Sequence, residues 1–233
     1  MFKAMKIIPA ISLLAISSPL LAAKSTVSQL PSFGFNQEFA GAANKGDITI
    51  DLYDSLAEPI EVRIGALGGE IMIDVTTVAN TARGIGYKHR IGNNMAAYGM
   101  LYLNTGGATS ITNITGGFSY TGQSGDFIYN GNAEVHSCTV CGAGNTSATN
   151  MDVKGAGFFK LKPNKFGGKM MIGGEVNLRL SPSPTTTSIY AGARWLPKPN
   201  VLIDLGLLTS LPAGATTTST FGTPAFARVA LTF

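Results

Sequence analysis

Apolar and polar residues alternate along much of this chain, and this alternation constrains its fold more than any other feature. Between 169 and 180 the even positions carry apolar residues or glycine, whereas the odd positions include Lys169, Glu175 and Arg179. Successive side chains of a β-strand point to opposite faces, so a period of two is typical of strands with one apolar face. The pattern predicts an all-β protein built from antiparallel strands.

Segments with this pattern recur along the chain, and clusters of Gly, Pro, Asn, Ser and Thr separate them. Tight turns near 92, 164 and 198 alternate with longer connections, which indicates a series of hairpins. The longer connections are expected over 105–113, 137–150, 181–186 and 211–222. About twelve strands are expected, with 10–14 possible, at 46–55, 59–67, 70–78, 82–90, 95–104, 114–120, 126–136, 151–162, 169–180, 187–195, 201–210 and 224–233.

One hairpin can be assigned a register from the sequence. Apolar residues occupy even positions before Gly68-Gly69 and odd positions after it. A two-residue turn at these glycines would pair Ile64 with Ile73 and Arg63 with Asp74, which keeps the apolar residues on one face. The alternative is a single long strand with a glycine bulge.

The composition argues against an ordinary soluble enzyme. Only 13% of the 233 residues are charged, against about 25% in typical globular proteins. Mean hydropathy is +0.21, yet the longest late uncharged stretch, 205–227, is interrupted by glycine and proline and does not fit a spanning helix. The chain is therefore either a secreted β-protein or a closed membrane barrel. Its net charge of +4 comes without a dense basic run, so no nucleic-acid partner is expected.

The N-terminal residues read as an export signal. Lys3 and Lys6 precede an apolar run, and Ala22-Ala23 supplies small residues for cleavage, so 1–23 is expected to be a removed signal peptide. The following segment, 24–45, is expected to be a periplasmic lead-in or plug. The barrel itself is expected over 46–233.

The end of the sequence carries a family resemblance. Val229, Leu231 and Phe233 share one face, opposite Arg228 and Thr232. This pattern resembles the closing strand of bacterial outer-membrane β-barrel proteins, a porin-like class. The resemblance implies a closed antiparallel transmembrane β-barrel in the outer membrane, with tight periplasmic turns and longer extracellular loops. It also implies contact with outer-membrane lipid and lipopolysaccharide, and with the barrel-assembly machinery through Val229, Leu231 and Phe233.

In such a barrel the polar face of each strand lines the lumen. A basic excess there favours a small passive channel for small anionic solutes, because fixed charges line the path of a permeating ion. The alternative is a salt-bridged, non-conducting structural or surface-interaction barrel, including an adhesion barrel, that acts through its extracellular loops. The lumen-facing candidates are Arg63, Asp74, Lys154, Lys160, Lys162, Lys169, Glu175, Arg179, Arg194, Asp204 and Arg228.

Cys138 and Cys141 lie in the predicted connection after 126–136. In an exported loop the interpretation that fits best is a small disulfide ring. His136 adds a third possible metal ligand, but a fourth is not evident, so neither a metal nor another cofactor is expected.

No catalytic group can be assembled from the sequence. The only histidines are His89 and His136, and His136 is expected on the same strand face as Glu134. No serine has a recognisable relation to either histidine, and no phosphate-loop or dinucleotide fingerprint occurs. The chain is therefore not expected to be an enzyme.

Overall fold

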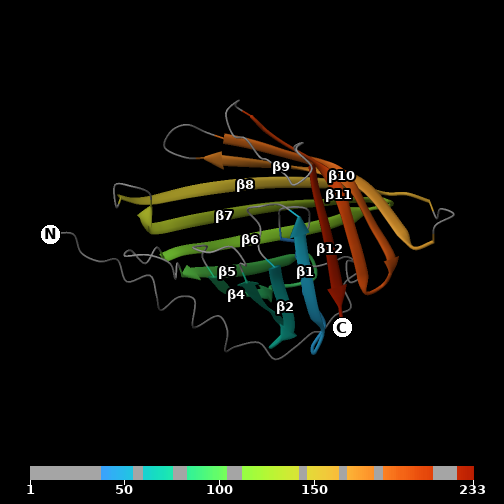
Figure 1. The fold of residues 1–233 in the computed structure, drawn as a ribbon, viewed down its shortest axis with the longest axis horizontal. Coiled ribbons are helices and arrows are strands. Elements are labelled where there is room, and N and C mark those ends of the chain that lie inside the picture. The colour runs from blue at the N-terminus through green and yellow to red at the C-terminus, as the bar shows by residue number, and fades with distance from the viewer. Residues whose placement is uncertain are drawn as a thin grey trace.

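The computed structural model describes residues 38–54, 60–75, 83–103, 112–141, 146–162, 167–180, 186–211 and 225–233. Within these ranges the chain forms twelve antiparallel strands in one closed barrel, which confirms the predicted all-β closed barrel and its strand number (Figure 1). None of these residues forms a helix long and apolar enough to cross a membrane. The strands are β1 (Ile48–Asp54), β2 (Ile60–Ala66), β3 (Gly69–Val75), β4 (Arg83–Arg90), β5 (Met95–Leu103), β6 (Thr112–Ser124), β7 (Phe127–Cys141), β8 (Thr146–Lys160), β9 (Lys169–Leu180), β10 (Thr186–Lys198), β11 (Val201–Leu211) and β12 (Ala225–Thr232).

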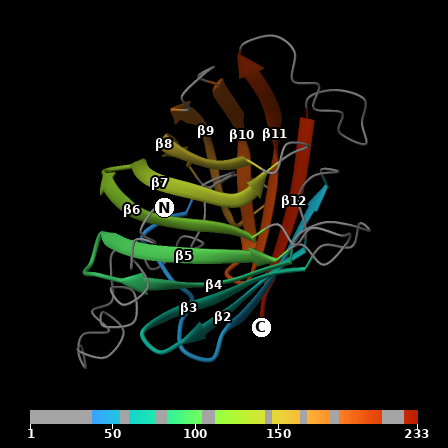
Figure 2. The ribbon, with the colours of Figure 1, turned by 90° about the vertical axis from the view of Figure 1, so that its left-hand side faces the viewer.

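Each strand pairs with its neighbours in sequence, and β1 pairs with β12 to close the ring (Figure 2). Ile48 and Phe233 exchange two backbone hydrogen bonds of 3.2 and 2.8 Å at this seam. Closure gives every strand two partners, so no strand edge is left with unpaired backbone groups.

The two ends of the barrel differ in their connections. At one end, which we call the turn end, short links such as 67–68, 91–94, 125–126 and 199–200 join the strands. The opposite end, which we call the loop end, carries connections that lie outside the described residues. Figure 1 shows β6, β7 and β8, of 13, 15 and 15 residues, running along the longest dimension of the barrel.

The predicted long connection over 137–150 is wrong. β7 continues to Cys141 and β8 begins at Thr146, so both cysteines have strand backbones. This stretch lacks apolar alternation, but its backbone groups still pair across the two strands, with a register shift between Cys138 and Cys141. Strand pairing is made by the backbone, so a polar sequence can extend a sheet that neighbouring residues have already begun.

The predicted register of the first hairpin is also wrong, by two residues. β2 and β3 form a hairpin and not one bulged strand, but its turn is Leu67-Gly68, with φ angles of 54° and 78°. Positive φ at both central residues is typical of a type I′ turn, which matches the twist of the strands. Arg63 therefore lies opposite Met72. A shift of two residues preserves the faces, because side chains alternate with a period of two.

The two faces of the wall differ in polarity in the opposite sense to a soluble protein. Outward side chains such as Phe118, Leu205 and Leu207 are 58–60% exposed. Inward positions include buried charged residues such as Asp51, Lys88 and Arg194. The apolar surface thus faces out, and the barrel interior holds the polar network described next.

Candidate functional site in the barrel interior

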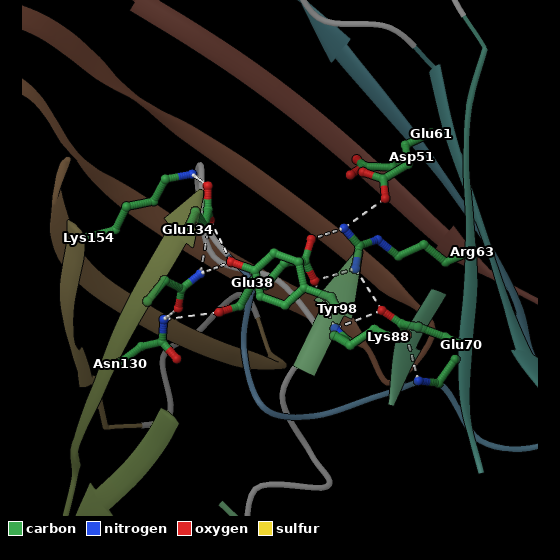
Figure 3. A network of polar contacts seen from close by, with 12 residues as sticks. Glu38, Asp51, Glu61, Arg63, Glu70, Lys88, Tyr98, Asn130, Glu134 and Lys154 are labelled. Carbon is green, nitrogen blue, oxygen red and sulfur yellow. Dashed lines mark hydrogen bonds and ion pairs between the residues drawn. The ribbon is translucent and has the colours of Figure 1, made fainter. Parts of the chain in front are cut away.

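Residues 38–44, just before β1, run along the inner surface of the wall, and we call them the inner segment. The predicted segment 24–45 is described only from residue 38, and residues 1–37, including the predicted signal peptide, lie outside the described ranges. Glu38 is the polar centre of the inner segment (Figure 3). Arg63 donates to its two carboxylate oxygens at 2.8 and 2.5 Å, and Lys88 donates at 2.8 Å.

The cations that hold Glu38 also contact carboxylates of the wall. Arg63 lies 2.7 Å from Glu61 and 2.6 Å from Glu70, and Lys88 lies 2.7 Å from Glu70. These residues come from β2, β3 and β4, whose inward side chains meet because the strands are neighbours in the sheet. The result is a buried cluster of three carboxylates around two cations.

Charge around Glu38 controls its protonation. Burial alone would raise the pKa of this carboxyl, but the charges and hydrogen bonds of Arg63 and Lys88 outweigh that effect, and the pKa is held well below its ordinary value of 4.5. Glu38 is therefore ionised at neutral pH and acts as the anionic anchor of the inner segment.

Backbone contacts attach the inner segment to the wall on both sides. The amide of Ala40 donates to Thr121 Oγ1 at 2.8 Å, and the amide of Ala43 donates to Glu70 Oε2 at 2.8 Å. The side chain of Asn130 donates to the carbonyl of Glu38 at 3.0 Å. Strands β3, β6 and β7 thus satisfy backbone groups of the inner segment, as buried polar groups require.

Gly65 on β2 allows the inner segment to approach the wall. A Cβ at this position would lie 1.7 Å from the carbonyl oxygen of Asn44, a contact that no side chain tolerates. The amide of Gly65 also donates to Asp47 at 2.9 Å. Glycine is therefore required where the chain passes over β2.

Phe39 joins the inner segment to an apolar cluster on the opposite side of the interior. Its ring packs edge-on against Phe158, with centroids 5.9 Å apart, and the Arg194 guanidinium lies 5.8 Å from the Phe39 centroid. Such aromatic and cation–π contacts favour one position of the ring. The cluster comprises Phe39, Ile128, Phe158, Met171, Leu196, Leu202, Phe226 and Ala230.

Ion pairs also join one part of the wall to another. Arg194 on β10 makes two hydrogen bonds of 2.8 and 2.7 Å to Asp204 on β11. Arg228 on β12 binds Asp51 on β1 through its Nε and Nη2 atoms. All four side chains are at most 1% exposed. In both pairs the two ionic partners belong to the wall, although the Arg194 guanidinium also lies over the Phe39 ring of the inner segment.

A second polar cluster lies further toward the loop end, on β6, β7 and β8. His136 Nδ1 is 2.9 Å from Thr115 Oγ1, and His136 Nε2 is 3.1 Å from Glu134 and 3.3 Å from Asp152. Lys154 contacts Glu134 at 2.9 Å, and Arg179 makes two hydrogen bonds of 3.0 Å to Asp152. The expected shared face of His136 and Glu134 is observed.

Hydrogen bonds connect the two clusters (Figure 3). Tyr98 donates to Glu134 at 2.5 Å, and Asn132 donates to the Tyr98 hydroxyl at 3.1 Å. Asn130 donates to Asn132 at 2.8 Å and also reaches the carbonyl of Glu38. A continuous polar path therefore runs from Glu38 to Glu134.

The structure brings most of the lumen-facing candidates to the inner surface. Arg63, Asp74, Glu175, Arg194, Asp204 and Arg228 are buried, Lys154 and Lys160 are half-buried, and Lys162, Lys169 and Arg179 are exposed at their ends of the strands. Arg63 meets Glu38, Glu61 and Glu70 in place of the predicted partner Asp74. Val229 and Phe233 are exposed and Leu231 is half-buried on the outer face of β12.

Several network residues were missing from those candidates. Asp51, Glu70, Lys88 and Tyr98 each lie on the inner face of a strand, so alternation counted from Arg63 or Asp74 would have found Glu70, and the same count in the neighbouring strands would have found the others. Glu38 belongs to no strand of the barrel wall and carries no periodic signal.

The side chains of Cys138 and Cys141 lie outside the described residues, so their disulfide stays a prediction. Their backbones are in β7. Residues three positions apart on an extended strand are separated by about 10 Å, whereas a disulfide needs Cα atoms within about 7 Å. A ring would therefore require the strand to bend at the register shift between them.

Comparison of the chain with protein-family models, curated protein sequences and solved structures finds no match. The geometry of the interior is therefore the basis for assigning a function.

Proposed function

We propose that this chain is an integral outer-membrane β-barrel protein that forms a small passive channel, and that the inner segment closes this channel in its resting state. The apolar outer face supports the membrane location, since large exposed apolar side chains are favourable against lipid and costly in water. A closed barrel also satisfies all strand backbone groups, as hydrocarbon requires. The partners in this proposal are outer-membrane lipid, lipopolysaccharide and the barrel-assembly machinery at β12; it includes no enzymatic activity.

The observation that carries the gating proposal is the position of Glu38 between Arg63 and Lys88. Through Glu38 and Phe39 the inner segment contacts β2 and β4 on one side of the interior and β8 and β10 on the other. A segment that crosses the interior between these strands would block the passage of solutes at its level.

The same contacts favour reversible release. When Glu38 leaves, Arg63 keeps Glu61 and Glu70, and Lys88 keeps Glu70. Removing the only partner of a buried charge is strongly unfavourable, but here each cation retains a carboxylate on the wall. The Glu38 carboxylate is hydrated again once the inner segment leaves the wall. The inner segment can therefore leave without stranding a buried charge.

A disulfide lock tests the proposal. The amide nitrogen of Ala40 is 2.8 Å from Thr121 Oγ1, so Ala40→Cys with Thr121→Cys should form a bond that fixes the inner segment to β6. Both native cysteines are first replaced by Cys138→Ser and Cys141→Ser. In a planar lipid bilayer we expect no conductance steps from the oxidised protein and clear steps after reduction.

The matched controls are the two single-cysteine variants in the same background, whose conductance should not respond to the reductant. A heat-dependent shift in gel mobility checks that every variant is a folded barrel. Conductance that is equal in the oxidised and reduced double variant would contradict gating by the inner segment.

A non-conducting barrel that acts through its extracellular loops is the second candidate. The buried pairs Arg194–Asp204 and Arg228–Asp51 favour it, because they bind wall to wall and remain when the inner segment leaves. This candidate predicts no conductance from the reduced lock variant or from a variant lacking 38–44. The bilayer measurement therefore separates the two.

A further inference from the structure

Three potential metal ligands converge on the inner surface at the second polar cluster. Glu134 and His136 are two positions apart on β7 and share a face, and Asp152 on β8 lies directly opposite Glu134 in the register. One ligand atom from each residue lies within 4.8 Å of the others. Neighbouring strands therefore hold one imidazole and two carboxylates around a common point.

The imidazole of His136 is oriented toward that point. Thr115 on β6 lies opposite His136 in the register, and its Oγ1 is 2.9 Å from Nδ1. In the tautomer that carries its proton on Nδ1, Nδ1–H donates to this hydroxyl and the lone pair of Nε2 is directed inward. Metal-binding histidines are commonly oriented in this way by a hydrogen bond to the other ring nitrogen.

The environment of His136 Nε2 favours a cation. This atom is buried, it lies 3.1 Å from a Glu134 oxygen and 3.3 Å from an Asp152 oxygen, and neither contact has the alignment of a hydrogen bond. Lone pairs on one imidazole nitrogen and two carboxylate oxygens repel one another unless a proton on Nε2 or a metal ion lies between them. The site can therefore hold either a protonated His136 or a metal ion.

Two cations contact the carboxylate oxygens that face Nε2. Arg179, whose side chain is 45% exposed, donates through Nη2 to Asp152 Oδ2 at 3.0 Å. Lys154 Nζ lies 2.9 Å from Glu134 Oε2. Both can remain as neighbours of metal-bound carboxylates, where their charges offset those of the ligands and reduce the affinity of the site. The 28% exposed side chain of His136 leaves the cluster accessible from the loop end.

We propose that Glu134, His136 and Asp152 bind one divalent transition-metal ion, with Zn²⁺ as the representative ion. Imidazole with carboxylates suits Zn²⁺ and its neighbours in the first transition row, and three protein ligands leave a position open for water. The site stands independently of the channel proposal, because it involves no residue of the inner segment.

Calorimetric titration of the metal-free barrel in detergent with Zn²⁺ alone tests the site, with Mg²⁺ as a hard-cation comparison. We expect one equivalent of Zn²⁺ per chain and no matching Mg²⁺ signal. His136→Ala should weaken binding at least tenfold. His89→Ala is the matched control, since His89 stacks on Tyr87 on the outer face, and it should bind Zn²⁺ as the unaltered protein does.

Two further measurements keep the result clear. The variant with Cys138→Ser and Cys141→Ser should retain the single equivalent, and Co²⁺ bound to the unaltered protein should show ligand-field bands without thiolate charge transfer. Loss of binding in the cysteine variant, a thiolate band, or equal affinity in the His136→Ala and His89→Ala variants would overturn the proposal. So would the absence of any Zn²⁺ binding, which would leave His136 as a member of an ion-pair cluster. The Co²⁺ spectrum decides the ligand type even if His136→Ala fails to fold.

Discussion

Arg228 on β12 and Asp51 on β1 form a buried ion pair across the seam that closes the barrel. Arg228 Nε lies 2.7 Å from Asp51 Oδ1, although the two residues are 177 positions apart in sequence. Arg228 also approaches Asp204 at 3.8 Å. The seam is therefore joined by side chains as well as by the strand ladder.

Arg228→Met should destabilise the barrel by about 3–5 kcal/mol, because the buried Asp51 carboxylate loses the guanidinium that pairs with it. Asp51→Asn should cost less, since Arg228 retains Asp204. Urea unfolding in lipid vesicles, followed by fluorescence of the single tryptophan, Trp195, measures both. A larger loss in Asp51→Asn than in Arg228→Met would contradict this asymmetry.

Glu38→Gln should open the channel. The substitution keeps the size of the side chain but removes the charge held by Arg63 and Lys88. Hydrogen bonds to charged groups contribute about 1.5–3 kcal/mol, so the open fraction in single-channel recordings should rise about tenfold or more. Asp126→Asn, at the exposed turn between β6 and β7, is the control and should leave the open fraction unchanged.

Acid should release the inner segment only at low pH. The folded pKa of Glu38 is lowered, so its contribution is complete above the ordinary value of 4.5 and is lost as pH falls through the lower folded pKa. The difference in open fraction between the unaltered protein and Glu38→Gln should stay constant from neutral pH to about pH 4 and shrink only below it. Glu61 and Glu70 face the same cations and remain in the Glu38→Gln variant, so this difference isolates Glu38. A difference that shrinks between pH 7 and pH 5 would count against Glu38 as the anchor.

Gly65→Ala should push the inner segment off β2. The added methyl would meet the carbonyl of Asn44, which is backbone and cannot rotate away. Trypsin cleavage after Lys45 should accelerate severalfold, as measured by mass spectrometry. Gly155→Ala provides the comparison, because a Cβ there meets no atom within 4 Å. Equal cleavage rates in the two variants would show that Gly65 does not position the segment.

Lys160→Glu should move ion selectivity toward cations. Lys160 is half-buried on the inner face of β8 near the turn end, where a fixed charge lines the proposed path. The measurement is the reversal potential under a salt gradient, made in the Glu38→Gln background so that the channel is open. Lys160→Gln should shift the potential in the same direction by a smaller amount. Identical potentials in all three proteins would remove Lys160 from the path.

Local alternation was enough to predict the barrel wall. The face of each residue from Lys169 to Leu180 follows from its parity, and parity is set by the backbone of a single strand. The register of a hairpin is less secure, because Gly68-Gly69 and Leu67-Gly68 are both plausible turns, and the choice between them shifts the strand pairing by two residues. A sequence with two adjacent glycines does not distinguish them.

The interior network could not be predicted in the same way. Glu38 meets Arg63 and Lys88 because the inner segment folds back into the barrel, and no periodicity marks a segment outside the strands. The meeting of His136, Thr115 and Asp152 depends on the registers between β6, β7 and β8. The length of β7 and β8 was missed for the related reason that pairing continues through a polar stretch.

The seam between β1 and β12 imposes an order on folding. Hairpins from β1 through β12 can form one after another, each between neighbours in sequence, but the ring is sealed only when the two most distant strands meet. Such long-range contacts form late, because the entropy of the intervening chain opposes them. The inner segment precedes β1 in the chain and contacts strands around the ring. It can therefore bind to the inner face most easily before β1 and β12 pair, while the sheet is still open. Pairing of β1 with β12 would then enclose the inner segment. This last pairing step would both close the barrel and fix the inner segment inside it.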